Sequence, residues 1–273
     1  MELHRNDGIY GDFAAVYDRF MDDTPYEKWC GLLEGLMQKY GVSRPKRDAE
    51  DPLEAEKNMV VDLGCGTGTL AELLYGRGYD LIGVDNSGAM LSIAMEKRGR
   101  SGSGILYLLQ DMRELELYST VGTIFSVCDS LNYILEEGEL LKVFSLVNNY
   151  LYPGGIFVFD FNTVYKYRDV IGDTVIAENR EDCSFIWENF YDPVEELNEY
   201  DVTVFVREKG EFFRKFTETH FQRGYTPDQV RNLVEKAGMT LVEMFDADTG
   251  GEVSHASERV CVVARERGKE RTI

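Results

Sequence analysis

A glycine-rich turn directly after an apolar strand is the feature that most constrains this chain. Residues 60–68 read Val-Val-Asp-Leu-Gly-Cys-Gly-Thr-Gly, and residues 69–75 continue as a predicted helix. Glycine has no Cβ, so such a turn lets the backbone approach a ligand closely. Free N–H groups collect at the helix N-terminus that follows the turn. The segment therefore predicts a site for a nucleotide-sized cofactor.

The spacing of the glycines narrows the choice of cofactor. Dinucleotide-binding loops follow the pattern Gly-x-Gly-x-x-Gly, whereas the three glycines here are separated by single residues, and Thr69 stands where the third motif glycine would be. A second apolar strand, residues 81–85, ends in Asp85, which is placed to accept hydrogen bonds from both ribose hydroxyls. An acid there fits any adenosine cofactor. The spacing disfavours a pyrophosphate ligand but leaves an NAD(P)-dependent oxidoreductase as an alternative.

Five motifs resemble those of the class I S-adenosylmethionine-dependent methyltransferases, and they occur in the right order over residues 59–162. They lie at residues 60–68, 83–91, 109–113, 125–132 and 151–160. The joint match is far more specific than a glycine loop alone. The resemblance implies S-adenosylmethionine as the cofactor and methyl transfer as the reaction.

The same resemblance implies roles for individual residues in cofactor binding. Asp62 would orient the loop and the cofactor's ammonium group, Asp111 would accept from the amine of adenine, and Cys128 would offer its backbone carbonyl. Tyr17 would cover the cofactor, although helix packing is an alternative role for it. Met90 and Met112 would flank adenine, with packing in the core as the alternative. The predicted cofactor-binding residues are Tyr17, Asp62, Gly64, Cys65, Gly66, Asp85, Asn86, Met90, Asp111, Met112 and Cys128.

Strand and helix signals alternate through the central part of the chain. This alternation predicts an α/β fold with a doubly wound, Rossmann-like and mostly parallel sheet, an antiparallel last strand, and ligands at the carboxyl ends of the strands. We expect residues 59–162 and 225–265 to form this core. Helices within residues 1–41 would cover the cofactor site, and the polar residues 42–58 would form a linker.

Residues 163–224, named the cap from here on, change to β-type alternation. Strands are predicted at 185–191, 199–206 and 212–221, with turns at 192–193 and 208–210. This pattern predicts a three-stranded antiparallel meander inserted on the substrate side of the core. The cap resembles that of small-molecule N-methyltransferases acting on amino sugars or glycine-like amines.

The cap also carries the candidate residues for the acceptor substrate. Methyl transfer needs alignment and exclusion of water more than acid–base chemistry. If the reaction uses a base, His220 is the best candidate because its pKa class suits neutral pH, and Tyr133 is a second catalytic candidate. Arg223 and Glu218 are predicted to bind substrate. A structural role for His220 and solvent exposure for Arg223 and Glu218 are the alternatives.

Composition disfavours a nucleic-acid substrate. The formal net charge is −20, whereas nucleic-acid binders carry clustered Lys and Arg that neutralise phosphates. Residues 129–132, Asp-Ser-Leu-Asn, also depart from the Asp/Asn-Pro-Pro-Tyr motif of enzymes that methylate nucleobase amines. A small molecule is therefore the predicted partner. A tRNA methyltransferase and a non-catalytic cofactor-binding module stay open as alternatives.

Other features of the sequence bear on localisation. No apolar run approaches the ~18–20 residues needed to cross a bilayer, and the N-terminus lacks the pattern of a signal peptide. The five cysteines include no Cys-x-x-Cys pair, so we expect reduced thiols and no metal site. These features predict a cytoplasmic protein with no membrane partner, and a homodimer stays open.

Overall fold

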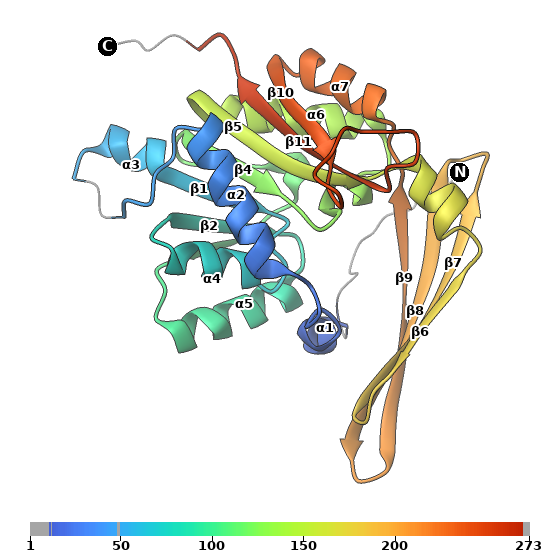
Figure 1. Cartoon of the computed structure of the whole chain (residues 1–273). Coiled ribbons are helices and arrows are strands. Elements are labelled where there is room, and N and C mark those ends of the chain that lie inside the picture. Colours follow the sequence, from blue (N-terminus) through green and yellow to red (C-terminus); the bar gives the residue numbers. More distant parts are fainter. Residues whose placement is uncertain (1–10, 12, 48–49, 270–273) are drawn as a thin grey trace.

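A seven-stranded sheet in the order β10-β11-β5-β4-β1-β2-β3 forms the centre of the molecule (Figure 1). The structure is a computed structural model, and it describes residues 11, 13–47 and 50–269. The run from β5 to β3 is parallel, whereas β11 is antiparallel to both of its neighbours. This confirms the predicted mostly parallel sheet with an antiparallel last strand. The strands are β1 (Met59–Leu63), β2 (Asp80–Asp85), β3 (Leu106–Leu109), β4 (Val121–Ser126), β5 (Leu151–Asn162), β10 (Met239–Asp246) and β11 (Arg259–Glu266).

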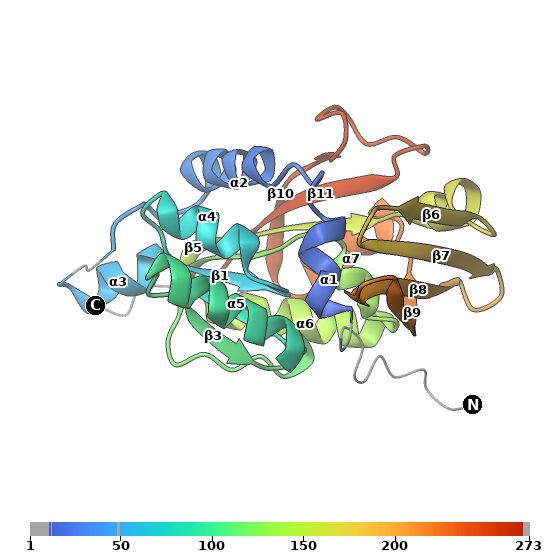
Figure 2. The same cartoon turned by 90° about the horizontal axis from the view of Figure 1, so that it is seen from below.

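Helices cover both faces of this sheet (Figure 2). One apolar cluster joins the sheet to α2 (Tyr26–Tyr40) and α4 (Thr69–Gly76), with α5 (Gly88–Ser101) beside α4. The other cluster joins it to α6 (Glu137–Tyr150) and α7 (Pro227–Lys236). Successive residues of a strand point to opposite faces, so Val60 packs in the first cluster and Val61 in the second. No helix in the described part of the chain is long and apolar enough to span a membrane.

The cap forms a second, antiparallel sheet in the order β6-β7-β8-β9. Its strands are β6 (Val175–Asn179), β7 (Cys183–Asp192), β8 (Leu197–Lys209) and β9 (Phe212–Arg223). The prediction of three strands is therefore wrong: it missed β6, a short edge strand whose residues are mostly exposed and show no apolar alternation.

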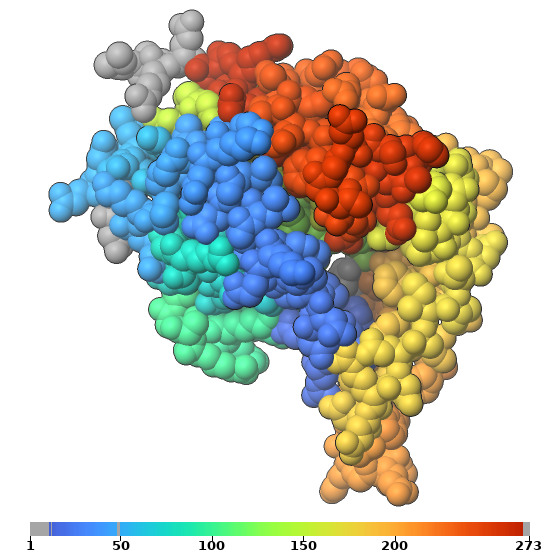
Figure 3. Space-filling view, in the orientation of Figure 1, coloured from blue at the N-terminus to red at the C-terminus, as the bar shows by residue number. Residues whose placement is uncertain are grey.

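Apolar contacts hold the cap against α1 (Ala14–Phe20). Val16 of α1 is buried with Tyr200, Val202 and Val204 of β8, and the ring of Phe20 meets that of Phe185 edge to face at 4.9 Å. Figure 3 shows the cap beside α1, with the tip of the β8–β9 hairpin projecting from the body of the molecule.

The segment predicted as a linker, residues 42–58, contains a helix. Its second part forms α3 (Pro52–Asn58). The side chain of Asp51 caps the helix by accepting from the N–H of Leu53 at 3.0 Å, and proline at the first helical position favours a helix start. The helix packs on β4. The prediction overlooked these end signals because the segment has no apolar stripe.

We expect Gly122, on β4, to tolerate no larger residue. A Cβ there would lie 1.8 Å from the carbonyl oxygen of Lys57 in α3 and 2.4 Å from Oγ of Ser43. Gly122→Ala should therefore cost about 1–3 kcal/mol of stability or more, measured by chemical denaturation. Gly99→Ala is the control, because Gly99 is a helical position with nothing within 4 Å of its added Cβ, and it should stabilise by about 0.5–1 kcal/mol. Wild-type stability in Gly122→Ala would contradict the packing of α3 on β4.

Candidate functional site

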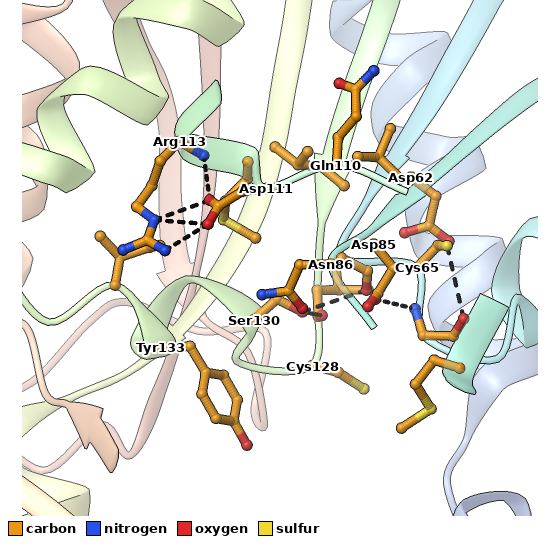
Figure 4. Close-up of a pocket in the computed structure, with 18 of the residues that line it drawn as sticks. Asp62, Cys65, Asp85, Asn86, Gln110, Asp111, Arg113, Cys128, Ser130 and Tyr133 are labelled. Carbon is orange, nitrogen blue, oxygen red and sulfur yellow. Dashed lines mark hydrogen bonds and ion pairs between the residues drawn. The ribbon is translucent and has the colours of Figure 1, made fainter. Parts of the chain in front are cut away.

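Loops at the carboxyl ends of the parallel strands enclose a cavity of about 600 Å³ (Figure 4). That volume is in the usual range for a small-molecule site. All the predicted cofactor-binding residues line it: Tyr17, Asp62, Gly64, Cys65, Gly66, Asp85, Asn86, Met90, Asp111, Met112 and Cys128. The structure thus brings together residues that lie more than a hundred positions apart in the sequence.

The glycine loop uses most of its own N–H groups. The N–H groups of Gly64 and Cys65 both donate to the carbonyl oxygen of Val84, at 2.8 and 3.0 Å. The N–H of Gly68 donates to the carbonyl oxygen of Cys65 at 2.9 Å. Pyrophosphate-binding loops instead point such groups at the ligand. All three glycines have positive φ, and a Cβ on Gly64 would lie 2.7 Å from Ser130 Oγ. The loop is therefore built for close packing rather than for holding phosphate.

Asp85 joins the glycine loop to the start of α5. One carboxylate oxygen accepts from the N–H of Gly66 at 2.7 Å, and the other accepts from the N–H of Ser87 at 2.8 Å. Burial raises the pKa of Asp85, although these hydrogen bonds oppose the shift. An ionised carboxylate offers about four lone pairs, so both oxygens retain acceptor capacity for the hydroxyls of a ribose.

Asp62 is a buried carboxylate with no hydrogen bond or ion pair to any residue that the structure describes. Its exposed fraction is 3%. Burial raises its pKa well above the ordinary value, and the nearby charge of Asp85 adds to the shift. Burying an unpaired charge is unfavourable. A cationic ligand group in the cavity would relieve this cost, and the ammonium group of an amino-acid cofactor fits the position.

Asp111 forms the opposite end of the cavity, after β3. Burial acts to raise its pKa, but hydrogen bonds from Arg113 outweigh burial and lower it. The N–H and Nε of Arg113 both donate to Asp111 Oδ1, at 2.8 and 2.9 Å. Asp111 is therefore an ionised acceptor held in a fixed direction. Sequence reasoning missed Arg113, although it lies in the third quoted motif.

The turn after β4 is strained and is held by a residue that the sequence did not single out. Cys128 and Asp129 have φ of 62° and 52°, which costs a non-glycine residue roughly 1–2 kcal/mol each. Their N–H groups donate to Asp160 Oδ2 and Oδ1, at 3.3 and 2.9 Å. Asp160 lies near the end of β5, is 6% exposed, and has Nη1 of Arg259 3.6 Å away. The last motif quoted from the sequence ends at Asp160, but it carried no signal of this role.

Tyr133 brings the cap into contact with the cavity. It lines the cavity, and its hydroxyl lies 2.6 Å from that of Tyr200 and 3.2 Å from Nδ1 of His220. His220 is buried and stacks on Tyr200 with ring centroids 5.0 Å apart. The structure therefore places His220 behind Tyr133, outside the set of described residues that line the cavity.

The two predicted substrate-binding residues are placed differently. Arg223 lines the cavity, donates to the carbonyl oxygen of Leu135 at 2.9 Å and pairs with Glu196 at 3.2 Å. Glu218 lies outside the lining: one oxygen accepts from the N–H of Phe13 at 3.0 Å, and the other is 3.6 Å from Nε2 of His220. The structure thus gives Glu218 a position between α1 and His220.

Comparisons with known proteins agree with this geometry. Residues 60–155 match the model of a methyltransferase domain. A putative methyltransferase of Geobacillus sp. (strain WCH70) is 34% identical over 256 residues, which cover 94% of this chain and 99% of the relative. A crystal structure of an S-adenosylmethionine-dependent methyltransferase from Clostridium acetobutylicum ATCC 824 is 28% identical, with a TM-score of 0.81 over 95% of this chain and 99% of that one.

A more distant likeness extends to the cap. The sugar N-methyltransferase KedS8 from Streptoalloteichus sp ATCC 53650 is 16% identical, with a TM-score of 0.73, and the match covers 98% of this chain and 99% of that one. At that identity the likeness is one of fold.

The alternative of an NAD(P)-dependent oxidoreductase is wrong, because sequence and structural relatives agree on methyl transfer, and most N–H groups of the glycine loop already have acceptors within the protein. The cavity, the buried carboxylate of Asp62 that has no partner among the described residues, and these relatives all point to one family. The chain is an enzyme of the class I family of S-adenosylmethionine-dependent methyltransferases, with S-adenosylmethionine as its cofactor.

Proposed function

We propose that the protein methylates a small cationic amine. The observation that carries this proposal is the charge of the cavity, whose lining has three basic side chains and seven carboxylates, three of which are assigned below to the cofactor. Two of the basic groups, Arg113 and Arg223, are already paired with carboxylates. A negative cavity concentrates cations and repels a phosphate backbone. The carboxylates are Asp62, Asp85, Asp111, Glu114, Glu136, Glu139 and Glu195.

The cap supports the same proposal. KedS8, which shares the fold together with the cap, is named a sugar N-methyltransferase. The sequence resemblance to N-methyltransferases of amino sugars and glycine-like amines concerns the same segment. A likeness of fold alone does not choose the substrate, so the proposal depends on the charge of the cavity.

The cofactor fits the strand ends of the core. Asp62 would face its ammonium group, Asp85 its ribose and Asp111 its adenine. When bound, it supplies a methyl group on a positively charged sulfur that leaves as a neutral thioether. The protein's remaining tasks are to align the acceptor nitrogen with that group, exclude water and take up one proton.

Tyr133 and His220 provide a path for that proton, because an ammonium nitrogen must be deprotonated before it can form a bond to carbon. The Tyr133 oxygen accepts the proton, and its own hydroxyl proton moves to Nδ1 of His220, 3.2 Å away. Glu218, 3.6 Å from Nε2, stabilises the imidazolium that results. Stacking on Tyr200 fixes the ring of His220. Tyr133 is then the catalytic residue, and His220 acts through it.

The raised pKa of Asp62 predicts that cofactor binding depends on pH. At acidic pH the folded protein holds a proton on Asp62, and this protonation favours the ligand-free fold. As pH rises through the raised pKa, the proton leaves and this contribution to stability is lost. The cofactor's ammonium prefers the ionised form, so binding should release a proton. We expect affinity to rise with pH while Asp62 is still protonated and to level off above its raised pKa, by at most about a factor of ten per pH unit. Calorimetry should show this rise in wild type and a flat profile in Asp62→Asn. A flat wild-type profile would exclude the role of Asp62.

Loss of the Tyr133 hydroxyl should slow catalysis without weakening cofactor binding. Tyr133→Phe keeps the ring but removes the proton path, and general acid–base contributions are about 10²–10⁴-fold. We expect kcat to fall by that factor while the Kd for S-adenosylhomocysteine changes less than about twofold. Tyr118→Phe, at a fully exposed tyrosine, should change neither quantity. An unchanged kcat in Tyr133→Phe would remove the tyrosine from the mechanism.

A direct screen tests the acceptor class. Purified protein would be incubated with S-adenosylmethionine and a panel of amino sugars, glycine derivatives, their hydroxyl counterparts and bulk tRNA. Mass spectrometry should detect a methylated amine, with no methylation of the matching hydroxyl compound or of tRNA. Methylation of tRNA, or of hydroxyl compounds alone, would overturn the proposal.

A further inference from the structure

The hydrogen bonds of the strained turn after β4 determine which way its carbonyl oxygens point. The chain has no cis peptide among the described residues, and in a trans peptide the carbonyl oxygen points opposite to the N–H of the same unit. The N–H groups of Cys128 and Asp129 both point to Asp160. The carbonyl oxygens of Val127 and Cys128 therefore point away from Asp160, which is not among the described residues that line the cavity.

Only one of these two oxygens is already used within the turn. The carbonyl oxygen of Val127 accepts from Ser130 Oγ at 3.1 Å. The carbonyl oxygen of Cys128 accepts no hydrogen bond from the described residues, and Cys128 lines the cavity together with Asp62. A carbonyl oxygen and a carboxylate that face the same space are suitable acceptors for an ammonium group, which has three donors.

We propose that Asp160 is a positioning residue for the cofactor. By holding both N–H groups of the strained turn, it aims the carbonyl oxygen of Cys128 at the position where Asp62 also meets the cofactor's ammonium group. Without Asp160, both N–H groups lose their acceptor, the strain of two non-glycine residues at positive φ is no longer offset by these bonds, and the carbonyl can turn away. Asp160 thus acts on the amino-acid end of the cofactor without contacting it. This role concerns cofactor binding and is independent of the acceptor proposed above.

Two ligands separate this role from a general role in folding. S-Adenosylhomocysteine has the amino-acid end, whereas 5′-methylthioadenosine has the same nucleoside and sulfur but no ammonium group. Asp160→Asn keeps the size of the side chain but replaces one acceptor with a donor that opposes a backbone N–H. We expect it to weaken binding of S-adenosylhomocysteine about tenfold and binding of 5′-methylthioadenosine less than about twofold. Calorimetry, or thermal shift with millimolar nucleoside, measures both.

The controls make each outcome decisive. Asp246→Asn changes a similarly buried carboxylate that accepts the N–H groups of Asp248 and Thr249, at 3.1 and 2.9 Å. It lies outside the described cavity lining and should affect neither ligand. If Asp160→Asn does not fold, Asp160→Glu keeps the charge, displaces both oxygens by one methylene and should give the same selective loss.

A double-mutant cycle tests whether Asp160 and Asp62 serve the same group. If both act on the ammonium, the loss in Asp62→Asn/Asp160→Asn should be smaller than the product of the single losses. Equal weakening of both ligands in the Asp160 variants, or no weakening of S-adenosylhomocysteine, would overturn the proposal.

Discussion

The burial of carboxylates at the carboxyl ends of the parallel strands is the constraint on which the site depends. Removing an ion from water is costly unless donors replace the water. Asp85 and Asp160 find such donors in backbone N–H groups of the loops beside them. Each loop is shaped by the carboxylate that it satisfies. Asp62 has no such partner among the described residues, so its charge is available to a ligand. A cationic group is therefore favoured at this position.

The acceptor side is connected to the core by side chains rather than by strand pairing. Helix α1 provides one such connection: Asp18 accepts from Thr67 of the glycine loop at 2.7 Å and pairs with Lys97 at 2.7 Å. On its other side, the N–H of Phe13 donates to Glu218 of the cap. The helix and its N-cap residue therefore contact both the glycine loop and the strand that carries His220. Movement of α1 would alter both halves of the site together.

Local sequence patterns predicted the core and the cofactor half of the site because each part is encoded in a short segment. These motifs combine an apolar strand, a glycine turn and an acid that are close together in the chain. They can therefore be recognised without knowledge of the tertiary structure. Strand β6 was missed because an exposed edge strand has no buried face to impose alternation. Helix α3 was missed because its signal is in its ends and not in its polar interior.

The acceptor half could not be assembled from the sequence for a different reason. Tyr133 and His220 are 87 residues apart, and their contact exists only because β9 pairs with β8 and brings the cap over the turn after β4. His220 was a candidate because of its chemistry, but no local pattern indicated that Tyr133 would lie between it and the cavity. The role proposed for Asp160 depends on packing in the same way, because the two N–H groups that bind its carboxylate lie 32 and 31 residues earlier in the chain. The residues predicted to bind the cofactor lie in short local motifs, whereas the residues proposed to orient them are brought into place by packing between distant segments. The residues proposed to meet the acceptor are therefore placed by the packing of the cap against the core.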